Sequence, residues 1–179
     1  MRKKGAEAIV YTEEFLGIKT VVKKRNPKRY RIKEIDEKIR IQRTRREARL
    51  LHKAKKAGIK TPVVLEVGRD FIRMEFVEGR KARGFEFELG KILGKLHNAD
   101  IVHGDFTPNN VLYNDGFVVI DFGLGFVSKR IEDKADDVVT ALYSVENKDG
   151  FIEGYKSTCK DAEKVLNRVK AILKRVRYA

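Results

Sequence analysis

The segment HGDFTPNN at residues 103–110, followed by DFG at residues 121–123, is the most informative part of this sequence. It places a carboxylate at Asp105, an amide five residues later at Asn110, and a second carboxylate eleven residues further on at Asp121. Phosphoryl transfer requires such a set. One carboxylate orients the attacking hydroxyl or accepts its proton, and a pair of oxygen ligands holds Mg²⁺ on the phosphates.

The order of these residues resembles the protein-kinase catalytic loop H-x-D-x-x-x-x-N and its D-F-G motif. The resemblance implies that Asp105 is the catalytic base, that Asn110 and Asp121 are the metal ligands, and that ATP and Mg²⁺ are the cofactors. The alternative is that these are ordinary turn-forming Asp and Asn residues. Both motifs in this order, around an Asp-Gly hairpin at residues 114–116, would rarely arise by chance.

A kinase also needs a strand lysine on the α- and β-phosphates and a helix glutamate that pairs with it. Lys23 ends the strand-like run Val21-Val22-Lys23, and Glu47 is the single acid between Arg40 and Lys56 in a predicted helix. A glutamate that faces the core side of a basic helix needs a cationic partner to offset its desolvation, and we expect Lys23 to be that partner. The alternatives are a surface lysine at 23 and a pair within the helix between Glu47 and a neighbouring arginine.

The hinge that binds adenine is assigned from its position in the sequence. The run MEFVEG at residues 74–79 lies at the end of the last strand predicted for the first part of the chain, where a kinase hinge would lie. There the backbone carbonyl of Glu75 and the backbone amide of Val77 would hydrogen-bond adenine, with Met74 behind it.

The phosphate-covering loop departs from the kinase pattern G-x-G-x-x-G. This chain offers only GAEA at residues 5–8, and a loop with one glycine is less permissive. We assign Gly5, Ala6 and Glu7 to nucleotide binding. Either ATP sits under this loop differently, or Glu7 closes over the site.

The order of elements predicts an α+β fold with two lobes, a bilobal protein-kinase-like arrangement. Residues 1–78 form a small N-lobe with an antiparallel sheet and one long helix, and residues 79–179 form a reduced, mostly helical C-lobe. Periodicity and turn signals predict the following elements: strands at 8–11, 17–24, 63–67, 71–77, 111–113 and 117–120, and helices at 35–57, 85–99, 133–145 and 159–177.

Composition excludes several classes of protein. Of the 179 residues, 42% are hydrophobic, which is enough for a buried core, so a disordered or fibrous chain is excluded. No stretch approaches the roughly 18 consecutive apolar residues of a membrane span, and no apolar segment follows the basic start. Cys159 is the single cysteine, which excludes an internal disulfide and a cysteine-based metal site. We therefore expect a cytoplasmic protein without a membrane partner.

The net charge of +14 is concentrated in the N-terminal third. Residues 1–60 carry 21 Lys and Arg against 7 Asp and Glu, and residues 164–179 carry six basic residues and no acidic ones. This distribution favours a polyanionic partner that binds outside an acidic centre. A charged surface adapted to heat is the alternative.

Four segments carry a closer resemblance: GAEA at 5–8, KKRNPKRYR at 23–31, RTRREARLL at 43–51 and the H-G-D-x-T-x-x-N loop. Together with the basic tail KRVRY at 174–178, they resemble the small atypical RIO-like Ser/Thr kinase of the KEOPS complex, the PRPK family. The resemblance runs nearly end to end. Only 56 residues follow Gly123, too few for the activation segment and substrate-docking helices of an ordinary protein kinase.

This resemblance implies a regulatory subunit with ATPase or Ser/Thr kinase activity, bound to the catalytic subunit that makes threonylcarbamoyladenosine in tRNA and to other KEOPS subunits. The basic N-terminal third and the C-terminal tail would contact tRNA. Two alternatives stay open. One is a kinase-fold adaptor that binds RNA or protein with incidental ATP binding, and the other is a small-molecule kinase of the aminoglycoside type.

Overall fold

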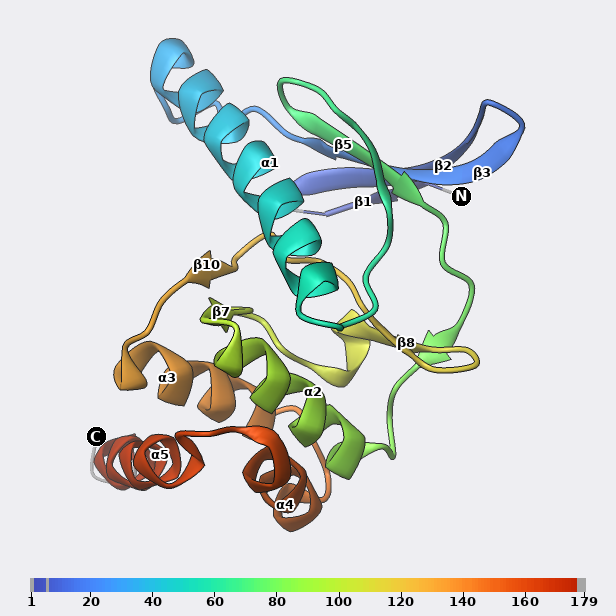
Figure 1. Cartoon of the computed structure of the whole chain (residues 1–179). Helices are drawn as coiled ribbons and strands as arrows, with labels where there is room; N and C mark the ends of the chain where they lie inside the picture. The colour runs from blue at the N-terminus through green and yellow to red at the C-terminus, as the bar shows by residue number, and fades with distance from the viewer. Residues whose placement is uncertain (1, 6, 177–179) are drawn as a thin grey trace.

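A five-stranded antiparallel sheet forms the N-terminal part of the computed structural model, which describes residues 2–5 and 7–176 (Figure 1). The strand order is β1-β2-β3-β5-β4, so β3 lies between β2 and β5. In this register Lys23 lies opposite Val10 on one side and Ile72 on the other. The strands are β1 (Arg2–Lys4), β2 (Ala8–Phe15), β3 (Ile18–Arg25), β4 (Val64–Val67) and β5 (Phe71–Glu75).

One long helix, α1 (Lys33–Lys56), crosses the space between this sheet and the rest of the chain (Figure 1). It confirms the predicted helix to within two residues at each end. The buried side of this helix changes from charged to apolar toward its C-terminal end. Glu47 is buried in its second half, and Leu50 and Leu51 beyond it belong to the main hydrophobic core. The helix stops at Gly58, whose φ of +78° belongs to the left-handed region that favours glycine.

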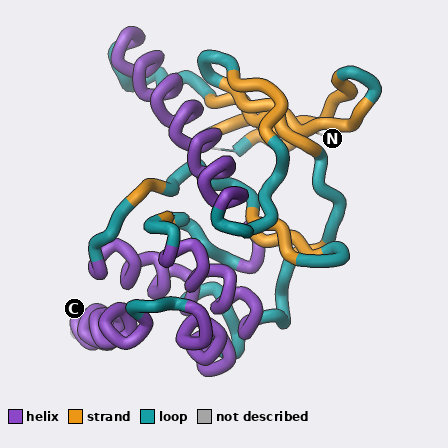
Figure 2. Tube along the Cα trace, in the orientation of Figure 1, coloured by secondary structure: helices purple, strands orange, loops and turns teal. Residues whose placement is uncertain are grey.

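The second half of the chain is mostly helical, with two small sheets of order β6-β8-β9 and β10-β7. Figure 2 shows its short strands between α1 and the lower helices. The predicted hairpin around residues 114–116 is confirmed by the antiparallel pairing of β8 with β9. The elements are β6 (Arg80–Lys81), α2 (Glu86–Asn98), β7 (Ile101–Val102), a 3₁₀ turn (Pro108–Asn110), β8 (Val111–Tyr113), β9 (Phe117–Val119), β10 (Phe126–Val127), α3 (Ile131–Leu142), α4 (Lys148–Thr158) and α5 (Ala162–Val176).

The observed α+β architecture confirms the predicted fold class. The proposed lobe boundary between residues 78 and 79 falls between β5 and β6 and remains a prediction. Of the predicted basic tail, Arg177 and Tyr178 lie outside the described residues. Within the described part of the chain, no helix is both long and apolar enough to cross a membrane.

The sequence patterns did not indicate helix α4 or the short strands β1, β6, β7 and β10. Helix α4 contains Gly150 and Gly154, and glycine is unfavourable in a helix interior. The structure explains the second of them, because a Cβ at Gly154 would lie 1.9 Å from the backbone oxygen of Phe87. On the facing helix, a Cβ at Gly90 would lie 2.1 Å from the backbone oxygen of Phe151. Glycine is therefore used here for close packing of α2 against α4.

We expect Gly154→Ala to destabilise the protein by about 2 kcal/mol, because overpacking outweighs the gain in helix propensity. Urea denaturation would measure the change in the free energy of unfolding. Lys156→Ala, on the exposed side of the same helix, is the control and should change it by less than about 0.5 kcal/mol. Equal stability of Gly154→Ala and the wild type would contradict this account of α4.

Candidate active site

The catalytic-loop residues lie on the segment between β7 and β8. The side-chain amide of Asn110 donates hydrogen bonds to the Oδ2 atom and to the backbone oxygen of Asp105, both at 2.9 Å. Asn110 thereby fixes the direction of the Asp105 carboxylate. Both bonds use the Nδ2 atom, so the Oδ1 atom of Asn110 is the one that could coordinate a metal ion.

Asp121 lies on the neighbouring segment, after β9. The Ile120 amide donates to the Asn110 backbone oxygen at 2.9 Å, which joins this segment to the catalytic loop. Asp121 has a φ of +62°, a left-handed conformation that Asp tolerates better than most residues. Its Oδ1 atom accepts hydrogen bonds from the Gly123 amide at 3.1 Å and from Lys23 Nζ at 2.6 Å. The two carboxylates of the predicted site are thus held on adjacent, hydrogen-bonded segments.

The predicted contact between Lys23 and Glu47 is present, with 2.8 Å between Lys23 Nζ and Glu47 Oε1. Burial alone would lower the pKa of Lys23, but the carboxylates of Glu47 and Asp121 outweigh it and raise that pKa. Burial likewise tends to raise the pKa of Asp121, and the nearby Lys23 ammonium group outweighs it and lowers that pKa. Lys23 and Asp121 are therefore both held in their charged forms.

Arg25 is a member of this cluster that the sequence analysis missed. Its guanidinium nitrogen lies 2.5 Å from Glu47 Oε2, and the exposed fractions of the Arg25 and Glu47 side chains are 5% and 2%. Lys23 and Arg25 are two positions apart on β3 and therefore face the same side of the sheet. This alternation is the signal that could have identified Arg25. Glu47 is thus buried between two cations.

The predicted hinge residues lie at the end of β5, which contains Met74 and Glu75, and just after it, at Val77. Val21 lies directly opposite Met74 in the register of β3 and β5, so Met74 shares a face with Val21 and Lys23. The Glu75 amide donates to the Val63 backbone oxygen at 2.9 Å. The Val77 amide makes no hydrogen bond within the part of the chain that the structure describes. Adenine binding at this amide stays a prediction.

The single-glycine loop between β1 and β2 is tied to α1. Glu7 forms ion pairs with Arg43 at 2.9 Å and with Lys28 at 3.3 Å. Burial tends to raise the pKa of Glu7, but Lys28 and Arg43 lower it overall. The Gly5 amide donates to the Ala8 backbone oxygen at 2.9 Å. Of the three predicted loop residues, Ala6 lies outside the described residues, and the Glu7 carboxylate pairs with α1 and the Lys28 segment.

Asp137 on α3 is the second residue that sequence reasoning missed. Its carboxylate accepts hydrogen bonds from the backbone amides of His103 at 2.6 Å and Gly104 at 2.9 Å. Gly104 has a φ of +78°, and a Cβ there would lie 2.7 Å from the Leu124 backbone oxygen. His103 is buried, which lowers its pKa, and its Nε2 atom donates to the Ile120 backbone oxygen at 3.1 Å. Asp137 thus anchors the start of the catalytic loop through backbone donors.

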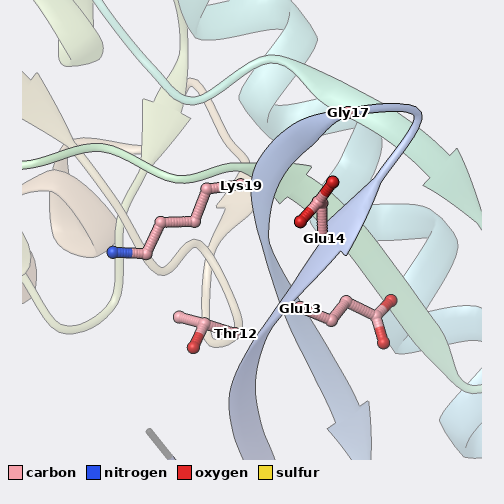
Figure 3. A pocket seen from close by; sticks show the side chains of 5 residues that line it. All are labelled: Thr12, Glu13, Glu14, Gly17 and Lys19. Carbon is pink, nitrogen blue, oxygen red and sulfur yellow. The ribbon is translucent and has the colours of Figure 1, made fainter.

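A separate hollow, of about 500 Å³, lies on the β2–β3 hairpin and contains none of the predicted site residues. Figure 3 shows the side chains of Lys19 and Thr12 on one side of this hairpin and Glu13 on the other. Lys19 shares the Lys23 face of β3, and its ammonium group lies 3.9 Å from the centre of the Phe76 ring. The hollow therefore lies at the far end of the sheet face that carries Lys23.

Comparison with known families identifies two matches. The RIO domain family matches residues 9–125, and the phosphotransferase enzyme family matches residues 99–158. The chain is 41% identical to a probable serine/threonine-protein kinase BUD32 homolog of Archaeoglobus fulgidus, over 88% of each protein. It is also 41% identical to a probable bifunctional tRNA threonylcarbamoyladenosine biosynthesis protein of Methanosarcina mazei, over 98% of this chain. The chain spans about a third (35%) of the length of that bifunctional relative.

Solved structures resemble this fold at low sequence identity. A Rio2 kinase–ADP/Mg²⁺–phosphoaspartate complex from Chaetomium thermophilum has a TM-score of 0.69 at 14% identity and covers 100% of this chain and 71% of its own. The macrolide 2′-phosphotransferase MphH from Brachybacterium faecium has a TM-score of 0.71 at 13% identity, with 97% and 82% covered. At these identities the likeness concerns the fold, which is protein-kinase-like.

Proposed function

The chain belongs to the RIO domain family and is 41% identical to the BUD32 homologue from Archaeoglobus, and we propose that it is an Mg-ATP-dependent atypical Ser/Thr kinase or ATPase. The observation that carries this proposal is the contact of Lys23 with both Glu47 and Asp121. That contact joins the sheet, the long helix and the segment after the catalytic loop into one site. A surface lysine in a basic strand has no reason to be buried between two carboxylates.

In the proposed reaction, Asp105 accepts the proton of the attacking hydroxyl or water. The attacking oxygen forms a bond to the γ-phosphorus, the bond to the β–γ bridging oxygen breaks, and ADP leaves. Asn110 holds the Asp105 carboxylate in one orientation throughout. Lys23 exchanges its contact with Asp121 for the α- and β-phosphates while it keeps Glu47.

The residues present suit Mg²⁺, which is usually held by one or two carboxylates together with substrate phosphates. Asp121 and the Oδ1 atom of Asn110 would hold the ion. When bound, Mg²⁺ neutralises the charge on the phosphates. Among the described residues no cluster of three or more His, Cys, Asp or Glu could hold a metal ion. Substrate phosphates and water would supply the remaining ligands.

Adenine binding is proposed for the hinge. The Val77 amide would donate to adenine and the Glu75 carbonyl would accept from it. Met74, on the Lys23 face of the sheet, would pack against the ring. Gly5, Ala6 and Glu7 would cover the phosphates, with Glu7 held by its ion pairs to the side of the site.

The partners proposed are the tRNA-modifying catalytic subunit of KEOPS and other KEOPS subunits, with the chain as a regulatory subunit. The relative from Methanosarcina, named as bifunctional in tRNA threonylcarbamoyladenosine biosynthesis, supports a partner of this kind. The 21 basic residues within positions 1–60 and the basic C-terminal tail would contact tRNA phosphates. A cytoplasmic location follows from such a role.

The test is Mg²⁺-dependent turnover of γ-labelled ATP, alone and with the tRNA-modifying catalytic subunit and tRNA. We expect Lys23→Met to lower kcat/KM by about 100-fold or more, since phosphate positioning is lost. Lys24→Met, on the opposite face of the same strand and exposed, is the matched control and should retain wild-type turnover.

Equal loss in the two variants would contradict the assignment of Lys23. If the wild-type chain turned over no ATP under any of these conditions yet still bound its partner, the kinase-fold adaptor would replace the enzyme as the function. The adaptor would also require salt-dependent tRNA binding that survives Lys23→Met.

A further inference from the structure

A buried chain of hydrogen bonds runs from α4 through α2 to α3, behind the catalytic loop. Tyr155 of α4 lies with its hydroxyl 2.7 Å from His97 Nδ1 on α2. The other ring nitrogen of His97, Nε2, lies 3.2 Å from Asp137 Oδ2 on α3. Tyr155 and His97 have no exposed surface, and Asp137 has almost none. Figure 1 shows these three helices side by side below β7.

The chemistry of the groups determines which atom donates and which accepts in each of these hydrogen bonds. The Asp137 carboxylate is an acceptor and already receives the amides of His103 and Gly104, so His97 Nε2 must carry the hydrogen that it shares with Asp137. In neutral His97 the Nδ1 atom is then an acceptor, and the Tyr155 hydroxyl donates to it. Asp137 therefore sets which nitrogen of His97 is protonated, and the Tyr155 hydroxyl supplies the donor that the other nitrogen, Nδ1, needs.

The Tyr155 hydroxyl, at the other end of this series of hydrogen bonds, also accepts a hydrogen bond. Cys159 donates from Sγ to the Tyr155 hydroxyl oxygen at 3.2 Å. Burial raises the pKa of Tyr155, so its proton stays on the hydroxyl. Every group from Cys159 to Asp137 therefore has a consistent donor or acceptor role.

The position of Tyr155 is rigid because α4 packs closely on α2. A Cβ at Gly90 would lie 2.7 Å from the Tyr155 amide nitrogen, so the α2 backbone approaches that of Tyr155 directly. The Tyr155 and His97 rings meet edge to face, with centroids 5.5 Å apart. A phenylalanine would fill the same space and make the same ring contact, so packing alone does not require the hydroxyl.

We propose that Tyr155 is a positioning residue for phosphoryl transfer, acting through His97 and Asp137 on the backbone that carries Asp105. It touches neither the nucleotide nor the acceptor. Its hydroxyl donates to Nδ1 and so fixes the orientation of the His97 ring that donates from Nε2 to Asp137. Asp137 in turn holds the amides of His103 and Gly104. The expected effect on kcat rests on the proposed kinase function. The expected effects on the His97 ring shifts and on amide exchange rest on the hydrogen bonds alone.

The test compares Tyr155→Phe with the wild type and with Tyr143→Phe, an exposed tyrosine on the same part of the chain. We expect Tyr155→Phe to lower kcat about fivefold to tenfold with KM for ATP within about twofold, because orientation is lost and substrate binding is kept. The ¹⁵N shift of His97 Nδ1 should change, because that nitrogen loses its hydrogen-bond donor while Nε2 keeps its hydrogen toward Asp137. Amide exchange at His103 and Gly104 should become about tenfold faster. Tyr143→Phe should change none of these.

A second comparison separates positioning from stability. In a His97→Gln background Tyr155→Phe has no imidazole ring to orient, so it should add no further change in amide exchange at His103 and Gly104. Additive effects, or unchanged ring shifts and exchange rates in Tyr155→Phe, would overturn the proposal.

The two proposals can fail separately. If the wild-type chain shows no ATP turnover but Tyr155→Phe still shifts the His97 resonances and speeds the two amides, the kinase function fails and the positioning chain stands. If turnover is normal and kcat is unchanged in a Tyr155→Phe protein with altered His97 shifts, the catalytic part of the inference fails.

Discussion

Asp105→Asn is expected to lower kcat for ATP turnover by about 10²- to 10³-fold, because the amide cannot accept the proton of the attacking hydroxyl. The fold should be unaffected. The side-chain oxygen of asparagine can still accept the hydrogen bond that Asn110 donates at 2.9 Å. Steady-state turnover of γ-labelled ATP and thermal unfolding of the same preparation would measure both quantities.

Asp115→Asn is the matched control for this prediction. Asp115 is exposed at the β8–β9 hairpin with a φ of +48°, a conformation that asparagine tolerates equally well. Wild-type turnover is expected there. Turnover by Asp105→Asn within threefold of the wild type would exclude Asp105 as the catalytic base.

Glu47→Gln is expected to destabilise the protein by about 3 kcal/mol or more, since it leaves two buried cations without their shared carboxylate. Lys23 and Arg25 are only 11% and 5% exposed at their side chains, so water cannot replace the lost charge. That loss is a large part of the total stability of an ordinary domain. Urea denaturation at neutral pH measures it, and ATP turnover should fall with it because Lys23 loses its fixed position.

Glu37→Gln provides the comparison on the same helix. Glu37 pairs with Arg69 at 2.6 Å on the exposed side of α1, where ion pairs contribute little. The expected change is less than about 1 kcal/mol. Similar losses in the two variants would show that the buried cluster adds nothing beyond an ordinary surface pair.

Much of the candidate site could be predicted from sequence because its residues sit at set intervals along one short segment. Asp105 and Asn110 are five residues apart in a loop, and the structure joins them by direct hydrogen bonds. The segment that carries Asp121 follows a hairpin that its Asp-Gly turn identifies. The fold class could be predicted for the same reason, since this spacing of Asp and Asn residues is typical of the protein-kinase-like fold.

Arg25 and Asp137 could not be found in this way. Arg25 lies in a basic run of three residues that looks like exposed surface, and only the strand alternation shows that two of the three face α1. Asp137 stands beside Asp136 in an amphipathic helix, and its partners in the loop are backbone amides, which leave no trace in the amino-acid sequence.

The missed helix α4 has a different cause. Glycine lowers helix propensity, so a pattern analysis counts Gly154 against a helix. The neighbouring backbone at Phe87 requires glycine at that position for a reason that depends on tertiary structure.

The single-glycine loop is the converse case. The sequence showed that this loop departs from the kinase pattern, but only the three-dimensional structure shows the ion pairs of Glu7.

The two cations on Glu47 make α1 a fixed element. In the proposed reaction Lys23 turns toward the nucleotide while Arg25 stays on Glu47, so we expect the helix to keep its anchor in the empty and the loaded states alike. A helix that never loses its anchor cannot serve as an on–off switch. We therefore expect control of the proposed kinase to come from outside its own fold, through access of the acceptor or through what docks beside the site. The isolated chain should then rest in a conformation ready for turnover.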